Sequence, residues 1–532
     1  MTVISVNSSH GSSKASDILL ISMQNDLDTV GLKSLHATLL DKGYTSILLY
    51  IPDVSADGPA WEAADNLITF IAGNAPGIIG ISLMSHEYAR AVSLTRFLKR
   101  HFPDTAVVWG GIHPTVAPAM SLDHADYVCV GEGESAVLDL MQAVRGGATP
   151  AGVPNFWYKE DGRVVKSPLK PLVTDLDSLP VPDHIPANSF IVHRRRVQEL
   201  NRPFFKKYAR WRGTVYSVMG SRGCPFACAY CCNDFYSKLY GSRHTIRRRQ
   251  VTALIEEIAG AVSRYPGIQY VNFHDDCFLA CSDDYLEAFC HQYKERVGIP
   301  FIVRCIPKFF TERKMRYLKA AGVAWISIGL QSASNRVLTG VYNRHSTVAD
   351  FLRASALIHR FRVAVYYDVI LDNPLEREAE KLSLVPVLSG VPKPYFLQLF
   401  SLVLYPGTVL YDRMIPLYPE KAREYLTKDY HTYQNNKLNR LIRISGYLPT
   451  GVMERLVAGY RRNPGKASFR LTLITAAMVS AIVLEPLTYF RLIRRSLGNN
   501  TLSAVMMLPA FFRVGFSRYV KQFLPSGRRD GV

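Results

Sequence analysis

Three cysteines lie close together in the middle of the chain, in the sequence Gly223-Cys-Pro-Phe-Ala-Cys-Ala-Tyr-Cys231. Their C-x3-C-x2-C spacing puts three thiolates, those of Cys224, Cys228 and Cys231, on one short loop. Three thiolates can bind three irons of a [4Fe–4S] cluster and leave the fourth iron without a protein ligand. An open metal position can bind and activate a substrate, whereas electron-transfer clusters usually have four protein ligands. The spacing therefore predicts a reactive cluster.

The other cysteines disfavour two alternative uses of this motif. A structural zinc site usually takes its ligands from two separated pairs of residues. The sequence has no second pair, because the remaining cysteines are Cys129, Cys232, Cys277, Cys281, Cys290 and Cys305. Disulfides are also disfavoured, because nine is an odd number and the polar N-terminus lacks the apolar stretch of a signal peptide. We therefore expect reduced thiols and a cytoplasmic protein.

With Ser221 and Arg222 before it, the cysteine motif resembles the signature of radical S-adenosylmethionine (SAM) enzymes. In that family the open iron binds the amino and carboxylate groups of SAM, and electron transfer cleaves a C–S bond to give a 5′-deoxyadenosyl radical. The resemblance implies that the three motif cysteines are the metal ligands and the catalytic centre, and that Tyr230 lies near the adenine. It also implies an external electron donor of the flavodoxin or ferredoxin type. Cys232 is not part of the pattern.

The elements around the motif must bring it to a binding site. Strand and helix patterns alternate over residues 214–420, and the strand at 215–218 leads directly into the cysteine loop. Further strands are expected at 270–273, 302–304, 325–329, 364–370 and 396–400. Active sites of parallel barrels form at the carboxyl ends of the strands. Six such strands are typical of the partial (β/α)6 barrel that the resemblance implies.

Polar residues follow several of these strands. The resemblance implies that Asp275, Asp276, Arg304, Gln331 and Ser332 surround SAM. The planar guanidinium of Arg304 suits a carboxylate, and Gln331 and Ser332 can satisfy ribose hydroxyls in a dry pocket. The alternative for each residue is a structural hydrogen bond at the end of a strand.

The first 148 residues also alternate between strand and helix patterns. Strands are expected at 17–22, 46–51, 77–83, 106–109 and 127–130, with helices at 31–43 and 87–101. This alternation predicts a doubly wound parallel sheet with ligand-binding loops at the carboxyl ends of the strands. The expected fold class is thus α/β, with a Rossmann-like domain, a barrel and a helical C-terminal segment.

Two glycine-containing loops follow strands of this first domain. Glycine lets the backbone approach a large flat ligand, although ordinary turns use it as well. Together with the downstream cysteines, the loops resemble the cobalamin-binding domain of class B radical SAM enzymes over residues 17–145. The residues implied to bind cobalamin are Gly110, Gly111, His113, Thr115, Gly131, Glu132 and Gly133. We expect His113 to be a loop residue rather than a metal ligand.

One loop departs from the pattern of some cobalamin proteins. Their D-x-H-x-x-G motif supplies a histidine to cobalt, whereas this chain reads Asp26-Leu-Asp-Thr-Val-Gly31. Asp28 replaces the histidine, so histidine ligation at this position is excluded. The sequence fits a cobalamin held without a histidine lower ligand; a domain that has lost cobalamin is the other interpretation.

Residues 149–213 are predicted to form a linker between the two domains. The proline-rich stretch 175–183 resembles the interdomain linker of the family, and the basic stretch 194–212 follows it. A solvated surface is the usual role of such charge, and binding of an anionic substrate or a lipid headgroup is the alternative.

The C-terminal region, residues 421–532, is predicted to be helical. The chain has a net charge of +19, and residues 437–532 contain 16 Lys and Arg residues against three acidic ones. The apolar runs at 471–484 and 502–512 are shorter than the ~20 residues of a transmembrane helix, and arginines flank both. This pattern favours a helix that lies on the inner face of a membrane, with a helical lid on the barrel as the alternative. Nucleic acid is disfavoured, because the basic residues flank aliphatic runs.

These patterns lead to one leading hypothesis and two alternatives. The leading hypothesis is a cobalamin-dependent radical SAM C-methyltransferase that acts on an unactivated carbon of an amphiphilic, lipid-like or anionic small molecule. The first alternative is a radical cyclase or rearrangement enzyme that uses cobalamin without methyl transfer. The second is an RNA-modifying enzyme, but methylthiotransferases of that kind need three clustered N-terminal cysteines, and this chain has only Cys129 there.

Overall fold

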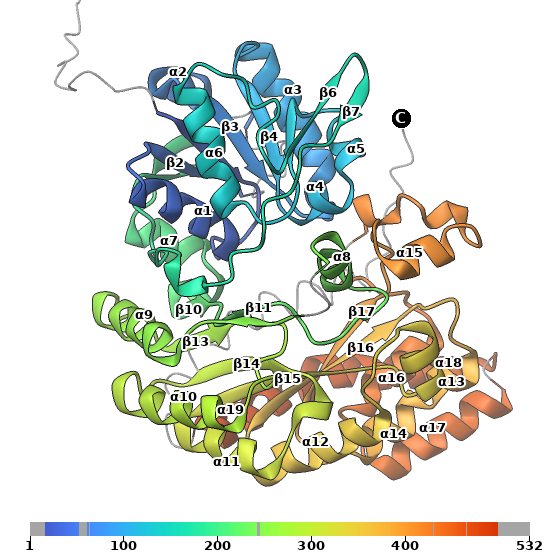
Figure 1. The fold of residues 1–532 in the computed structure, drawn as a ribbon. Helices are drawn as coiled ribbons and strands as arrows, with labels where there is room; N and C mark the ends of the chain where they lie inside the picture. The colour runs from blue at the N-terminus through green and yellow to red at the C-terminus, as the bar shows by residue number, and fades with distance from the viewer. Residues whose placement is uncertain are drawn as a thin grey trace, which may run out of the picture. The chain divides into compact units, whose positions relative to one another are not determined.

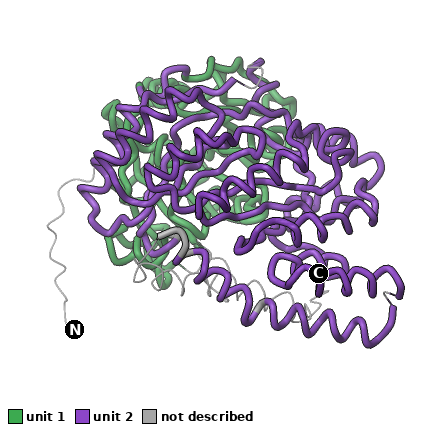
Figure 2. Tube along the Cα trace, turned by 90° about the horizontal axis from the view of Figure 1, so that it is seen from below, with its two compact units in different colours: residues 1–173, 178–210 green, residues 174–177, 211–532 purple. Residues whose placement is uncertain are grey.

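The computed structural model describes residues 16–52, 61–62, 64–241, 245–428, 430–463 and 465–497. The chain forms two compact units (Figure 2). Unit 1 comprises residues 1–173 and 178–210, and unit 2 comprises residues 174–177 and 211–532. The predicted apolar run at 502–512 lies outside the described residues.

Unit 1 is built on a twisted sheet with helices on both faces (Figure 1). Its central parallel strands are β1 (Ile18–Ser22), β2 (Ser46–Tyr50), β3 (Ile78–Ser82), β4 (Ala106–Gly110) and β5 (Tyr127–Cys129). Their order in the sheet is β2-β1-β3-β4-β5, a doubly wound order whose ligands bind at the carboxyl ends of the strands. The predicted doubly wound domain is therefore confirmed.

The helices of unit 1 connect these strands and cover their apolar faces. They include α1 (Val30–Asp41), α2 (Leu67–Asn74), α3 (Tyr88–His101), α4 (Ile112–Val116), α5 (Pro118–Ser121) and α6 (Glu134–Arg145). The strands are buried on both sides, which explains their nearly continuous runs of Ile, Leu and Val.

The predicted linker, residues 149–213, contains regular structure that belongs mainly to the unit 1 sheet. It forms β6 (Phe156–Glu160), β7 (Arg163–Val165), β8 (Ser189–His193), β9 (Arg196–Glu199) and α7 (Arg202–Tyr208). Strand β8 pairs in parallel with β2, and β6 pairs antiparallel with β5. These strands are short and lie toward the sheet edges, so the proline-rich and basic composition around them obscured them in the sequence.

Unit 2 contains the six-stranded parallel sheet that the partial barrel requires. Its strands are β10 (Val215–Val218), β13 (Tyr270–Phe273), β14 (Phe301–Cys305), β15 (Val323–Gln331), β16 (Ala364–Leu371) and β17 (Phe396–Ser401). They lie in sequential order, and every neighbouring pair is parallel. Each strand therefore ends at the same edge, as predicted.

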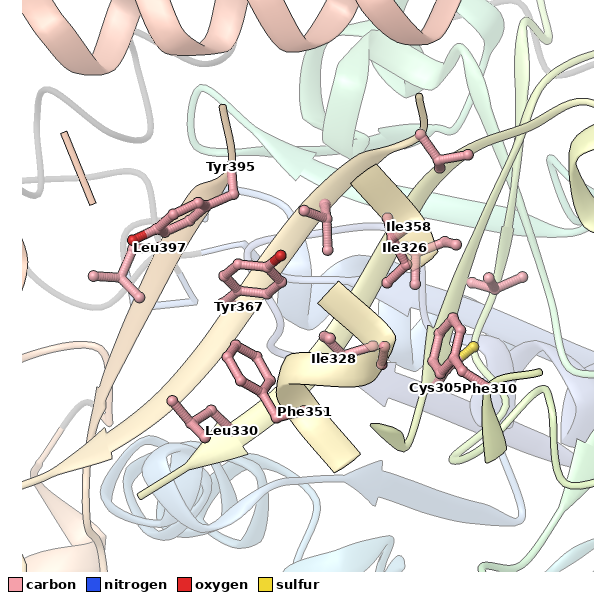
Figure 3. Close-up of a cluster of buried hydrophobic side chains, with 14 of the residues drawn as sticks. Cys305, Phe310, Ile326, Ile328, Leu330, Phe351, Ile358, Tyr367, Tyr395 and Leu397 are labelled. Atoms are coloured by element: carbon pink, nitrogen blue, oxygen red, sulfur yellow. The ribbon is translucent and has the colours of Figure 1, made fainter. Parts of the chain in front are cut away.

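Helices α9 (Val251–Arg264), α10 (Asp283–Arg296), α11 (Glu312–Ala321) and α12 (Val348–Arg360) pack on the outer face of this sheet (Figure 1). Figure 3 shows how alternate residues of β15, such as Ile326 and Ile328, pack against Phe351 and Ile358 of α12. The intervening β15 residues, such as Ser327, face the other side of the sheet.

The C-terminal helices also belong to unit 2. They are α16 (Lys437–Ser445), α17 (Thr450–Arg462), α18 (Ala467–Val479), the π-helical segment η8 (Ser480–Leu484) and α19 (Glu485–Leu497). Tyr489 of α19 is buried and stacks on Trp325 of β15, with 5.8 Å between ring centroids. Arg443 of α16 donates to Glu485 at 2.7 Å. The start of α19 is therefore anchored to the barrel, in agreement with the helical-lid alternative.

Tyr489→Ala is expected to lower the free energy of unfolding by about 3 kcal/mol, because it removes a buried aromatic ring from this contact. Leu487→Ala is the matched control on the same helix. Leu487 is 46% exposed, so its truncation should cost less than about 0.5 kcal/mol. Urea unfolding of both variants measures the difference. Equal costs would show that α19 does not pack on the barrel.

Candidate functional site

The cysteine loop begins where the first barrel strand ends. After β10, the short strand β11 (Ser221–Arg222) pairs with β12 (Arg247–Arg248), and the loop then leads into α8 (Cys232–Leu239). Gly223 has φ +100°, and a Cβ there would collide with the Thr245 carbonyl. Glycine is therefore required at the point where the chain turns into the motif.

The three motif thiols border one small apolar cluster. Cys228 packs with Phe226, Cys277 and Ile306, and Cys224 and Cys231 contact the same cluster. Burial raises the pKa of the Cys224 thiol to about 12 and also raises that of Cys228, so the free thiols are protonated, and binding of iron would release their protons. Across the described part of the chain, no three His, Cys, Asp or Glu residues lie close enough to hold a single metal ion. The three motif thiols border the same group of apolar side chains, and Cys224, Cys228 and Cys231 would be the donors for a multi-iron cluster bound there.

Arg344 is a site residue that the sequence analysis missed. It follows the π-helical turn η5 (Val337–Val341), and its buried guanidinium donates to the Tyr230 hydroxyl at 3.4 Å and contacts the Cys228 sulfur at 3.7 Å. It also donates to the Gly329 carbonyl at 3.3 Å. The Arg344 charge opposes the burial effect on the pKa of Cys228. Because Arg344 lies 116 residues after Cys228, no local pattern could reveal it.

Arg344→Gln is expected to retain the cluster but to make it harder to reduce. A cation next to a ligand sulfur stabilises the additional negative charge of the reduced cluster. The reduction potential followed by electron paramagnetic resonance (EPR) should therefore fall in this variant. Arg336→Gln is the matched control, because Arg336 is exposed and pairs with Glu380 at 2.6 Å. A potential that is unchanged in Arg344→Gln would contradict this role.

The two aspartates after β13 differ in their surroundings. Asp275 is buried, and its carboxylate accepts the Gly220 N–H at 2.9 Å and the Ser221 hydroxyl. Both carboxylate oxygens of Asp275 thus accept hydrogen bonds from the segment that leads into the cysteine loop. Asp275 therefore positions this segment. The neighbouring Asp276 is open to solvent and hydrogen-bonds Asn233 of α8. Asp276 is therefore the acid that lies near the cysteine loop, and it could accept a hydrogen bond from the amino group of SAM.

Arg304 and Asp368 add charged groups to the inner face of the barrel. Arg304 of β14 donates to the Phe273 carbonyl at 3.0 Å. Asp368 of β16 accepts from the Ser327 hydroxyl at 2.8 Å, while its other oxygen has no hydrogen-bond partner among the described residues. Burial raises the pKa of Asp368 to about 6, and Arg304 partly offsets this effect. Asp368 was not predicted as a site residue, although it is the one acidic residue within the apolar pattern of β16.

Gln331 and Ser332 lie at the end of β15, as predicted. Gln331 has φ +65°, and its buried Oε1 lacks a hydrogen-bond partner in the part of the chain that the structure describes. Ser332 is fully buried and donates to Glu376. Gln331 is thus available to a ligand, whereas the Ser332 hydroxyl is occupied by Glu376. Burial raises the pKa of Glu376 to about 7.

The pKa of Glu376 should make the stability of the protein depend on pH. Its pKa rises from 4.5 to about 7 on folding, so the folded state binds more protons than the unfolded state between these values. The free energy of unfolding should therefore fall as pH rises through this window, by up to about 3 kcal/mol. Glu376→Gln should remove that loss, so its stability relative to wild type should rise between about pH 5 and pH 8.

Glu380→Gln is the matched control for this pH dependence. The hydrogen bond from Arg336 lowers the pKa of Glu380 to about 2, which lies below the tested range. Its effect on urea unfolding should therefore be the same at about pH 5 and pH 8. The same pH dependence in both variants would contradict the assignment to Glu376.

In unit 1, the two predicted glycine loops are joined to each other. Gly111 has φ +101°, and a Cβ there would lie 2.9 Å from the Leu83 carbonyl oxygen. Thr115 donates to the Gly111 carbonyl at 2.8 Å and accepts the Gly131 N–H at 3.1 Å. Gly110 ends β4, and Gly131, Glu132 and Gly133 connect β5 to α6. This glycine cradle lies at the carboxyl ends of neighbouring strands, where doubly wound sheets bind ligands, so it would hold a large flat ligand such as cobalamin.

His113 lies in the short helix α4, directly after the first glycine loop. Its ring is fully buried, its Nδ1 is 3.1 Å from the Ser85 hydroxyl, and it packs on Tyr88 with 5.1 Å between ring centroids. Burial lowers its pKa to about 4, so the imidazole is neutral near pH 7. The expectation of a loop residue is wrong, because His113 belongs to a helix, and its ring packs within the protein against Ser85 and Tyr88. Asp28, at the position of the absent histidine, donates its N–H to Asp26 at 3.1 Å within a local turn.

Two family models match separate parts of the chain. The B12 binding domain matches residues 16–141, and the Radical SAM superfamily matches residues 218–380. A related curated protein is the uncharacterized methyltransferase PH0819 of Pyrococcus horikoshii, 26% identical over 71% of this chain and 80% of that protein. The anaerobic magnesium-protoporphyrin IX monomethyl ester cyclase of Rubrivivax gelatinosus is 24% identical over 59% of this chain, which spans about half of that protein (54%).

Solved structures agree with this assignment at the level of fold. The radical SAM methyltransferase TsrM of Kitasatospora setae, bound to tryptophan and a SAM analogue, has a TM-score of 0.60 and 17% identity, over 76% of each chain. The cobalamin-dependent SAM radical enzyme OxsB, with aqua-cobalamin bound, has a TM-score of 0.61 and 15% identity, over 96% of this chain and 76% of OxsB. The order of a B12-binding domain followed by a radical SAM domain is thus present in this chain.

Proposed function

The chain is a radical SAM enzyme with an N-terminal B12-binding domain, and from this premise we propose that it methylates an unactivated carbon of an amphiphilic small molecule. The observation that carries the proposal is the presence of both domains in one chain that is related over 71% of its length to a methyltransferase. When bound, the cluster and SAM supply a radical that removes a hydrogen atom, and cobalamin supplies the methyl group.

The residues of this chain have distinct roles in that reaction. The [4Fe–4S] cluster is held by Cys224, Cys228 and Cys231, and the apolar side chains around these cysteines exclude water. Arg344 fixes a positive charge beside Cys228, and Asp276 offers an acceptor at the loop. The glycine cradle would hold cobalamin, and Gly111 allows its loop to pass close to the Leu83 carbonyl.

The amphiphilic nature of the substrate is proposed from the C-terminal helices. The exposed apolar residues of α18 include Leu471, at 67% exposure, and Met478, at 46%. Such a face favours a location on the inner surface of a membrane, where lipid-like substrates are found. A flavodoxin- or ferredoxin-type donor would supply the electron for each turnover.

The test uses the anaerobically reconstituted full-length protein, methyl-labelled SAM, reduced flavodoxin and a bacterial lipid extract. Methyl transfer consumes two SAM molecules, and it should yield one 5′-deoxyadenosine and one S-adenosylhomocysteine per labelled lipid-phase product. The label should depend on added cobalamin. The relatives that are named as cyclases make a cyclase the second candidate. Formation of 5′-deoxyadenosine with a changed but unlabelled product would favour the cyclase and exclude methyl transfer.

A further inference from the structure

A cavity of about 900 Å³ lies among the C-terminal helices of unit 2. Basic side chains dominate its charged lining: Lys381, Lys421, Lys437, Arg440 and Arg470. Only two acidic residues, Asp372 and Glu378, line the same cavity. A volume of this size is within the range of small-molecule sites, and the excess of positive charge favours an anionic ligand.

The two acids of this cavity are already engaged in the protein. Asp372 accepts from the Ser401 hydroxyl at 2.7 Å and from the Asn439 side chain at 2.8 Å. Glu378 accepts from the Tyr460 hydroxyl at 2.9 Å. Among the described residues, by contrast, no ion pair involves Lys437 or Arg470. Lys421 pairs with Glu424 at 3.5 Å and Arg440 donates to Asn435 at 2.7 Å, so Lys437 and Arg470 are the side chains that remain available to an anion.

An apolar surface lies on the same helix as part of this cavity. Arg470, Leu473 and Ile474 of α18 line the cavity, while Leu471 and Met478 are exposed. The exposed apolar side chains continue along the helical segment and comprise Leu471, Met478, Val479, Ile482, Val483 and Leu487. Arg470 and Ile474 are four residues apart, so they lie one above the other along one side of this apolar stripe. The basic cavity therefore borders an unusually apolar exposed face.

The packing of α19 shows whether the C-terminal helical segment could cross a membrane or only lie on its surface. On length and composition alone, the 26-residue helical segment Ala467–Leu492, which contains an 18-residue window with a mean hydropathy of 1.8, could span a bilayer. Tyr489 and Leu492 are buried against the barrel, however, and Glu485 is paired with Arg443. This half of the segment is therefore held to the protein, and only its exposed side can contact lipid.

We propose that this surface docks on a bilayer, with the phosphate headgroup of an anionic phospholipid in the basic cavity and the apolar face of α18 among the acyl chains. The inference rests on the membrane association in the proposed function and names its ligand. It is independent of methyl transfer. Charge complementarity identifies the headgroup, and the adjoining apolar face identifies the ligand as a lipid rather than a soluble phosphate.

Vesicle flotation of the reconstituted full-length protein tests this proposal. The protein should float with vesicles that contain phosphatidylglycerol and not with vesicles of phosphatidylcholine alone. Combined Lys437→Gln, Arg440→Gln and Arg470→Gln substitutions should weaken this binding at least tenfold. The matched control, Arg455→Gln, Arg461→Gln and Arg462→Gln, removes the same charge from α17 residues outside the cavity and should still bind.

Three outcomes would overturn the proposal. An equal loss in the control variant would show general charge attraction without a headgroup site. Binding of inorganic phosphate without flotation would show that the cavity binds a soluble anion. Flotation with neither type of vesicle would show that the surface does not dock on a bilayer. Iron and cobalamin contents should match wild type in all variants, which confirms that they fold. Flotation requires no turnover, so its failure is distinguishable from failure of the proposed methyl transfer.

Discussion

Changing Cys224, Cys228 and Cys231 to alanine together should abolish iron binding and all formation of 5′-deoxyadenosine from SAM. The three thiols border one group of apolar side chains, and they are the donors that the loop offers to an iron–sulfur cluster. Wild-type protein reconstituted under anaerobic conditions should contain about four irons per chain, and the triple variant should contain essentially none. Iron analysis, visible absorption and chromatography of the nucleoside product measure the effect.

Cys232→Ala provides the control within the same loop. Cys232 follows the motif and begins α8, and the C-x3-C-x2-C pattern does not include it. This variant should retain the cluster and its activity. If the triple variant kept four irons, or if Cys232→Ala lost them, the assignment of ligands to the motif would be wrong.

Gly111→Ala should weaken cobalamin binding at least tenfold while the rest of the protein stays folded. The residue has φ +101°, which costs a side-chain-bearing residue about 1–2 kcal/mol. Its Cβ would also lie 2.9 Å from the Leu83 carbonyl oxygen, so the loop after β3 must shift. This shift would change the shape of the cradle at the carboxyl end of the sheet. Titration with aqua-cobalamin followed by absorption measures the dissociation constant.

Gly147→Ala separates backbone strain from the loss of space. Gly147 has φ +74°, but nothing lies within 4 Å of the position that a Cβ would occupy. The control should therefore lose some stability and still bind cobalamin as wild type does. Equal weakening in both variants would assign the effect to general strain in unit 1 and not to the cradle.

The sequence predicted the parts of the fold that carry strong local patterns. The buried strands β1 to β5 and the six barrel strands appear as apolar runs, and the cysteine spacing is local. The edge strands β6 to β9 were not predicted, because short strands in a proline-rich, basic segment lack a clear alternation of apolar and polar residues.

The candidate site was only partly predictable for a similar reason. Arg344 reaches Cys228 from a distant segment, and only the folded chain brings the two together. Asp275 was predicted at the site, but the structure engages both of its oxygens with Gly220 and Ser221. Position at the end of a strand therefore predicts nearness to the site, whereas hydrogen-bond partners decide the role.

The central claim is that the three-cysteine loop leaves one iron of its cluster open to SAM. The most direct measurement is the EPR spectrum of the reduced, reconstituted protein with and without SAM. Binding of SAM at an open iron should shift the g values of the cluster, and the same change should be absent with 5′-methylthioadenosine, which lacks the amino and carboxylate groups. A spectrum that SAM leaves unchanged, from a protein with full iron content, would contradict the account.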